Sequence, residues 1–281
     1  MKRIVFRFDV DTHKCIRDGV PNLLRLGETY QTGFSFFLNA GKAVSLTDSV
    51  RDIISRGGVK SDSEEVLMMS ARQKLGTADY VKAAFLNPDI ACYKTSVRKL
   101  YHSRSEMGIH GGRNHMIWHK HADQWTRERL ESEIDWALAK IRNIIPEYKP
   151  KGFASPGWTG SPMLEEVLAR KGFLYCADYR CRKHKNVRKE GRYLPYLGVN
   201  LLGEPGGVAF FEHCRMRGLS SKQIIQFVMD SIRSNEVTVV YDHPYYAGIR
   251  ELNCIGKIIE MVTKSEDMEI VTLEKLIAKG V

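Results

Sequence analysis

The chain has 281 residues, with 43% hydrophobic and 27% charged side chains and a formal net charge of +10 at pH 7. These values lie near the averages of globular proteins and exclude a disordered, collagen-like or coiled-coil chain. A chain of this size buries about three quarters of its unfolded surface and needs no metal to fold. Any metal that it binds would therefore serve its chemistry.

The first residues, MKRIVFRFDVDTH, contain only a short apolar stretch, which Asp9 and Asp11 interrupt. This pattern is not that of a signal peptide, and no uncharged run reaches the roughly 18 residues that span a bilayer. Six scattered cysteines lack the spacing of a disulfide framework, and Cys176 and Cys181 have no second pair to complete a zinc site. We therefore expect reduced thiols and a cytoplasmic protein, at the inner face of the membrane if its substrate is lipid-linked.

Short runs rich in β-branched and aromatic residues alternate with longer segments of helical period, which indicates strands joined by crossover helices. The pattern predicts an α/β fold, and the number of strands suggests a barrel. The predicted helices cover residues 126–145, 162–171 and 220–234, with one more near the C-terminus. In chain order, the predicted strands cover residues 3–8, 34–38, 107–110, 152–154, 173–177, 208–211 and 237–241.

Residues 45–105 break this alternation. They contain three helical segments, DSVRDIISR, ADYVKAAFL and SVRKLYHS, with no strand between them. We interpret these residues as a helical insertion after the second strand. No repeat, low-complexity segment or Pro- or Ser-rich linker marks a boundary, so residues 1–281 are expected to form one domain.

The first chemical motif is the pair Asp9 and Asp11 in FDVDT, at the carboxyl end of the first strand. On a continuing strand, residues i and i+2 face the same side. Parallel barrels place their active sites at the carboxyl ends of their strands. A polar strand end without a chemical role is the alternative for an isolated Asp-x-Asp.

The second motif is GIHGGRNH, residues 108–115, directly after the third predicted strand. Its glycines let the backbone turn sharply, so His110 and His115 can converge. One Asp and two His suit a divalent metal and leave positions for water and substrate. A His-rich surface segment is the alternative, since His119 and His121 follow.

Together these motifs resemble those of the polysaccharide-deacetylase family, also called the NodB-homology family or carbohydrate esterase family 4. Asp-x-Asp follows the first strand, two His follow the third, and Pro-Gly-Trp, an Asp and a late His come after them. FDVDT, FSFFLNAGK and EMGIHGG are most similar to deformylases of lipid-linked aminoarabinose and to cell-surface polysaccharide deacetylases. The resemblance covers residues 3–243 and implies a distorted (β/α) barrel with a single catalytic domain.

The resemblance also implies a role for each motif. Asp9 would be the general base, which takes a proton from the attacking water, and His243 in VVYDHP the general acid, which protonates the leaving amine. Asp11, His110 and His115 would hold a divalent metal, which we expect to be zinc.

Further residues would bind the substrate. Pro156 and Trp158 lie in SPGW, which resembles the groove-forming third motif, and Asp178 in CADYR resembles the fourth. The third motif usually begins with an Arg that orients the base, whereas here Ser155 or Ala154 stands at that place. Arg180 is the candidate replacement and a candidate substrate-binding residue.

The His spacing also departs from the family pattern. His110 and His115 are five residues apart, whereas relatives space their two His by four, and Asn114 occupies that place. Either Asn114 replaces a ligand or the glycines accommodate one extra residue. We favour His115, because imidazole binds zinc far better than a neutral amide oxygen. His213 in FFEHC is a second candidate for the general acid.

A basic segment directly follows Asp178, since residues 180–192 carry seven Lys or Arg against one Glu. A solvated loop is the plain interpretation of such a run. Its place at the barrel mouth favours an anionic substrate, such as a sugar joined to phosphate, or an acidic membrane surface.

We therefore predict a metal-dependent hydrolase that removes an acetyl or formyl group from an amino sugar of a cell-surface glycan, such as lipopolysaccharide, or of its lipid-linked precursor. Peripheral membrane contact would accompany a lipid-linked substrate. We expect no nucleic-acid partner, because residues 180–192 lack interleaved aromatic side chains. The alternatives are a degenerate relative that binds sugar without turnover and a basic module that binds anionic lipid or nucleic acid.

Overall fold

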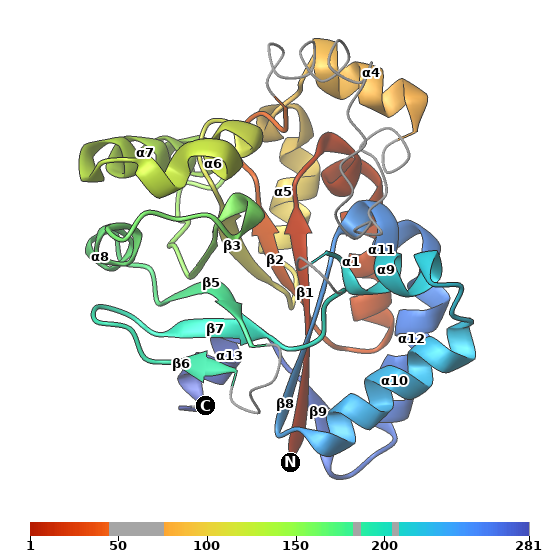
Figure 1. Cartoon of the computed structure of the whole chain (residues 1–281). Coiled ribbons are helices and arrows are strands. Elements are labelled where there is room, and N and C mark those ends of the chain that lie inside the picture. Colours follow the sequence, from red (N-terminus) through yellow and green to blue (C-terminus); the bar gives the residue numbers. More distant parts are fainter. Residues whose placement is uncertain (45–75, 182–186, 204–207, 281) are drawn as a thin grey trace, which may run out of the picture.

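A curved, mostly parallel sheet forms the centre of the computed structural model, which describes residues 1–44, 76–181, 187–203 and 208–280 (Figure 1). The strand order is β6-β7-β5-β4-β3-β2-β1-β8, and β9 pairs with the first residues of β1. The strands are β1 (Lys2–Val10), β2 (Ser35–Leu38), β3 (Glu106–His110), β4 (Gly152–Ala154), β5 (Tyr175–Arg180), β6 (Arg188–Lys189), β7 (Tyr196–Val199), β8 (Val237–Asp242) and β9 (Met268–Ile270).

The two ends of the sheet meet and close it into a barrel. Leu201, just after β7, donates a backbone hydrogen bond to Val239 of β8 over 3.1 Å and accepts one from Tyr241 over 3.0 Å. The wall consists of the parallel strands β1 to β5, β7 and β8, while β6 runs antiparallel to β7. This arrangement confirms the predicted α/β barrel of about seven strands.

Strand β1 contributes to two cores at once. Its apolar residues 4, 6, 8 and 10 pack with the core beneath the helices, whereas Val5 belongs to a second core inside the barrel. Strands buried on both faces are typical of parallel sheets. Because side chains alternate along a strand, Arg7 and Asp9 share the interior face of Val5, and the interior therefore holds charged side chains.

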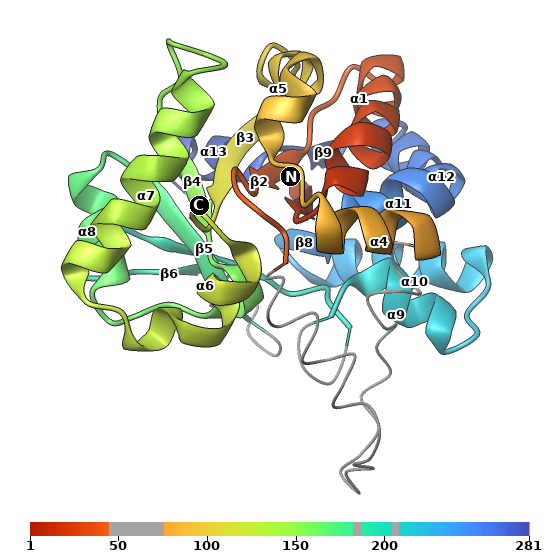
Figure 2. The same cartoon turned by 90° about the horizontal axis from the view of Figure 1, so that it is seen from above.

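Helices surround the sheet (Figure 2). Within the described part of the chain, no helix is long and apolar enough to cross a membrane. The longer helices are α1 (Val20–Thr29), α4 (Thr77–Phe85), α5 (Lys94–Tyr101), α7 (Arg127–Arg142), α10 (Ser221–Ser234) and α12 (Leu252–Thr263). The shorter ones are η1 (Cys15–Gly19), η2 (Ile90–Tyr93), α6 (His115–His121), η3 (Ala122–Gln124), η4 (Pro156–Trp158), α8 (Leu164–Arg170), α9 (Phe210–Met216), α11 (Pro244–Arg250) and α13 (Leu273–Ala278).

Six of the predicted strands are confirmed, as β1 to β5 and β8, and the predicted strand over residues 208–211 is wrong. The chain instead forms α9 from Phe210 onward, where Phe210 and Cys214 are buried and four residues apart. A short apolar run fits a strand and a buried helix equally well, and here the helical period continues beyond the run. Strands β6, β7 and β9 were not predicted.

The insertion between β2 and β3 is described in part. The helices predicted over ADYVKAAFL and SVRKLYHS are confirmed as α4 and α5. The helix predicted over DSVRDIISR lies outside the described residues. The organisation of residues 1–281 as one catalytic domain stays a prediction.

Candidate metal centre

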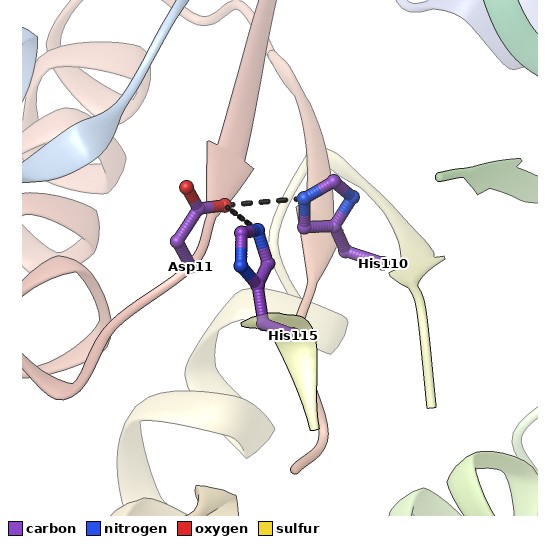
Figure 3. A group of neighbouring side chains, drawn as sticks. All are labelled: Asp11, His110 and His115. Carbon is purple, nitrogen blue, oxygen red and sulfur yellow. Dashed lines mark ion pairs between the residues drawn. The ribbon is translucent and has the colours of Figure 1, made fainter. Parts of the chain in front are cut away.

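Three side chains converge where β1 and β3 end (Figure 3). Asp11 follows β1, His110 is the last residue of β3, and His115 is the first residue of α6. Oδ1 of Asp11 lies 3.2 Å from Nε2 of His110 and 3.5 Å from Nε2 of His115. One ligand atom from each residue lies within 4.8 Å of the other two, which is close enough to hold one metal ion.

The surroundings of these atoms fit a metal. Oδ1 of Asp11 is buried and makes no hydrogen bond within the described residues, although such atoms normally find a partner. Burial opposes the charge of Asp11, but His115 and His243 outweigh it and hold its pKa well below the usual range. A carboxylate and two imidazoles are donors that zinc and related divalent ions bind.

The tautomer of His110 also suits metal binding. Its Nδ1–H donates to the carbonyl oxygen of Ala154 in β4 over 2.8 Å, which in the neutral ring leaves the lone pair of Nε2 facing Asp11. Burial lowers the pKa of His110, but the carboxylates of Asp9 and Asp11 outweigh this effect and raise it. The imidazole therefore sits in a negative environment that also attracts a cation.

The backbone between the two His explains how a five-residue spacing is accommodated. Gly111 has a φ of +75°, and a Cβ atom there would lie 2.6 Å from the ring of Pro156. Asn114 then caps α6, because its Oδ1 accepts the N–H of Ile117 over 3.1 Å. The side chain of Asn114 is thus engaged in the helix cap, and the imidazole of His115 faces Asp11.

Asp9 lies deeper in the barrel and pairs with Arg7. Its Oδ1 accepts from Nε of Arg7 over 3.0 Å and its Oδ2 from Nη2 over 2.9 Å, while Oδ2 lies 3.9 Å from Nε2 of His110. Burial opposes the charge on Arg7, but Asp9 outweighs it and raises the pKa of Arg7. Arg7 therefore supplies the guanidinium on Asp9, whereas the sequence suggested Arg180. Residues two apart on a strand share a face, so the position of Arg7 two residues before Asp9 is the sequence signal that could have identified this pair.

His243, the residue after β8, approaches Asp11. Its Nε2 lies 3.2 Å from Oδ2 of Asp11 and 3.2 Å from the hydroxyl oxygen of Tyr241. The neighbouring Asp242 accepts hydrogen bonds from the backbone N–H groups of Phe211 and His243, and burial raises its pKa to about 7. The structure places His213, the second candidate for the acid, on helix α9 and not at a strand end.

The third and fourth motifs meet at the ends of β4 and β5. The N–H of Ser155 donates to Oδ1 of Asp178 over 2.7 Å, and its hydroxyl donates to Oδ2 over 2.5 Å. Trp158 is half-buried, with its ring 5.1 Å from that of Tyr241 and 6.0 Å from the guanidinium of Arg180. Pro156 is buried. Ser155 thus engages Asp178 at the place where the family pattern suggested an Arg, and Trp158 remains partly open to a ligand.

The basic segment after β5 is described only at its ends. Arg182, Lys183 and Lys185 lie outside the described residues, and Arg188 pairs with Glu190 over 2.5 Å.

All six cysteines are free thiols, including Cys176 and Cys181.

Comparisons with known proteins find similar chains, although no protein-family model matches this chain. The chain is 25% identical over 199 residues to a probable 4-deoxy-4-formamido-L-arabinose-phosphoundecaprenol deformylase of Shewanella sediminis. The match covers 70% of this chain and 60% of that relative, so the chain spans less than two thirds of the length of the relative.

Solved structures share the fold. A proposed polysaccharide deacetylase of Mycobacterium smegmatis has a TM-score of 0.64 at 13% identity, over 99% of this chain and 89% of its own. A family 4 acetyl xylan esterase of Clostridium thermocellum, in complex with a cobalt ion, has a TM-score of 0.53 at 14% identity, over 100% of this chain and 93% of its own. The chain therefore has the polysaccharide-deacetylase fold, and its resemblance to the NodB-homology family is confirmed.

Proposed function

We propose that this chain is a metal-dependent hydrolase that removes an N-acyl group, acetyl or formyl, from an amino sugar. The observation that carries the proposal is the combination of Asp11, His110 and His115 with a separate carboxylate, Asp9, and a separate imidazole, His243, at the same barrel end. Amide hydrolysis needs an activated water, a proton acceptor and a proton donor. These five residues can supply all three.

Asp11, His110 and His115 would hold the metal, and we expect zinc. When bound, the ion polarises the amide carbonyl and lowers the pKa of water from 15.7 toward about 7. The hydrogen bond from His110 to Ala154 keeps one ligand oriented.

Asp9 accepts the proton from the attacking water in this proposal. It is 2% exposed, and Arg7 engages each of its oxygens once. A carboxylate has about four acceptor positions, so Asp9 retains room for a water. Because Oδ2 of Asp9 lies 3.9 Å from Nε2 of His110, that water would lie beside the ligand cluster, Asp11, His110 and His115.

His243 donates the proton to the leaving amine. Its Nε2 contacts both Asp11 and the hydroxyl of Tyr241, so the proton-carrying nitrogen faces the ligand cluster. The ring of Tyr245 stacks on His243 at 5.4 Å between centroids, which restricts rotation of the imidazole.

The substrate is proposed to be an amino sugar of a cell-surface glycan or its lipid-linked precursor. Trp158 offers an aromatic face beside the site, on which the apolar face of a sugar ring can lie. Arg180 is exposed and lies near Trp158, so it can bind a phosphate joined to that sugar. The similarity to a deformylase of a phosphoundecaprenol-linked sugar supports this substrate class.

A lipid-linked substrate requires contact with a membrane surface, and α4 carries side chains suited to it. Val81 and Phe85 in α4 are 47% and 72% exposed, and Leu86, directly after it, is 74% exposed. Helix α4 lies at the end of the barrel to which β1 points (Figure 1), and Asp79 within it contacts His13, two residues after Asp11, over 3.0 Å. Exposed apolar side chains on a helix beside the site support peripheral docking at the headgroup level.

The proposal is tested by metal analysis and by measuring release of acetate and formate from N-acylated amino sugars, both free and undecaprenyl-phosphate-linked. We expect metal-dependent release of one acid. His110→Ala should bind little metal and release no acid, whereas His121→Ala, at the exposed end of α6, is the matched control and should retain both. Metal-loaded protein that binds these sugars without releasing either acid would instead support the degenerate alternative.

A further inference from the structure

The interior of the barrel contains a buried cation that the ligand cluster does not need. Arg7 is 0% exposed and is the only Arg or Lys among the buried polar residues of the described chain. A buried guanidinium loses its hydration, so it persists only where partners of opposite charge and good geometry compensate. The groups that contact Arg7 therefore indicate its role.

Arg7 fixes the plane of the Asp9 carboxylate. Nε and Nη2 reach the two different oxygens of Asp9 over 3.0 and 2.9 Å. Such a two-point contact determines orientation, which a single ammonium group cannot do. The side-chain pair is formed within one strand, between residues two apart.

The guanidinium is itself held by the opposite wall. Nη1 donates to the carbonyl oxygen of Ala177 in β5. Its carbon lies 4.9 Å from the ring centre of Phe37, 4.4 Å from that of Trp158 and 5.3 Å from that of Tyr241. Contacts from β2, β5, β8 and the segment after β4 thus leave Arg7 little freedom.

We propose that Arg7 is the positioning residue of the proton acceptor Asp9, holding its carboxylate in one orientation beside the ligand cluster. The inference rests on the proposed function, in which Asp9 takes a proton from water. The carbonyl of Ala177 and the three rings act on Asp9 through Arg7. A role in folding alone predicts a lower Tm with unchanged kcat, so kcat is the quantity that tests the positioning role.

The test compares Arg7→Met, Arg7→Lys, Asp9→Asn and the double variant Arg7→Met with Asp9→Asn. We expect Arg7→Met to lower kcat by about 10²-fold, the scale of a misplaced catalytic group, with KM and bound metal within about twofold of wild type. Arg7→Lys keeps the charge and loses the two-point contact, so its kcat should fall by at least about tenfold. In the Asp9→Asn background, Arg7→Met should change the residual kcat by less than about twofold.

Arg215→Met is the matched control. Arg215 binds the buried carboxylate of Glu251 at two points, over 2.8 and 2.7 Å, outside the ligand cluster. This variant should lower Tm and leave kcat per folded molecule unchanged. This control shows what the loss of a two-point ion pair does by itself, so that any further fall of kcat in Arg7→Met can be assigned to the orientation of Asp9.

The outcomes distinguish the inference from the proposed function. Near-normal kcat in Arg7→Lys, or an equal fall of kcat for Arg7→Met with and without Asp9→Asn, would overturn the positioning role while the hydrolase stands. Full activity of Asp9→Asn would remove Asp9 as the base and with it the inference. If Arg7→Met does not fold, the result for Arg7→Lys decides.

Discussion

Glu106, at the amino end of β3, and Asp11, beyond the carboxyl end of β1, show how differently the two ends of the barrel treat a carboxylate. Glu106 accepts hydrogen bonds from the hydroxyls of Ser35 and Tyr175 and from the N–H of Glu274. Oδ1 of Asp11 makes no hydrogen bond within the described residues and faces imidazole nitrogens.

The difference separates a structural carboxylate from one that can bind a ligand. Glu106 joins β2, β5 and the start of α13, and both of its oxygens accept hydrogen bonds from the fold. The fold leaves Asp11 incompletely satisfied, a cost that a bound cation can offset. Substitution of Asp11 should therefore affect metal binding and turnover, whereas substitution of Glu106 should affect the free energy of unfolding.

The largest effect is expected for Asp11→Asn. This change removes the only carboxylate of the ligand cluster, so metal binding and acid release should both fall to background. Calorimetric titration of the metal-free protein with zinc measures metal binding independently of turnover. Wild-type affinity in this variant would exclude Asp11 as a ligand.

Asp9→Asn should have the next largest effect. We expect metal binding to remain, because Asp9 is not in the cluster, and kcat to fall by about 10² to 10⁴-fold, as for removal of a general base. The measurement is acid release at saturating substrate with metal content determined in the same sample. Loss of the metal together with activity would show that Asp9 is a ligand.

At the other end of the barrel, Glu106→Ala should lower the free energy of unfolding by about 1 to 3 kcal/mol. It would leave the buried Tyr175 hydroxyl and the N–H of Glu274 without an acceptor. Urea denaturation measures the effect. Because Glu106 lies away from the ligand cluster, kcat per folded molecule should not change, and a large change would contradict the separation of the two ends.

The pH dependence of stability sharpens this comparison. Burial raises the pKa of Glu106 above its ordinary value of 4.5. The folded state then retains this proton longer than the unfolded state, so stability is lost as pH rises from 4.5 through the folded pKa. Urea denaturation over this range should show a flatter dependence for Glu106→Gln, with Glu236→Gln, at an exposed carboxylate, as the control. An unchanged slope would contradict the prediction.

The sequence predicted the convergence of Asp11, His110 and His115 because each lies at or just beyond the end of a strand whose local pattern is clear. Strands β1 and β3 run parallel with only β2 between them, so their carboxyl ends lie at the same edge of the sheet and local patterns sufficed for this part of the site. Nothing local shows that Arg7 crosses the interior to Ala177, 170 residues later in the chain. That contact depends on barrel closure, which is a property of the whole sheet.

Short elements were harder to predict for a related reason. Strand β6 has two residues and β9 three, so neither carries a readable period, and both form because a neighbouring strand offers hydrogen-bond partners. The apolar run at Phe210 and Phe211 fits both a strand and a buried helix. In such segments tertiary contacts decide the structure.

The smallest expected effect concerns membrane contact through α4. Phe85 and Leu86 are largely exposed, so Phe85→Ser with Leu86→Ser should leave stability and turnover of a water-soluble acylated sugar unchanged. Binding to vesicles containing anionic lipid should weaken by about tenfold, equivalent to about 1.4 kcal/mol, because part of the transfer energy of two apolar side chains is lost. Cosedimentation with vesicles measures this, and Met163→Ser, at a 42% exposed methionine before α8, is the control. Equal binding by all three proteins would show that α4 does not dock at the membrane, and would leave the ligand cluster and its proposed chemistry untouched.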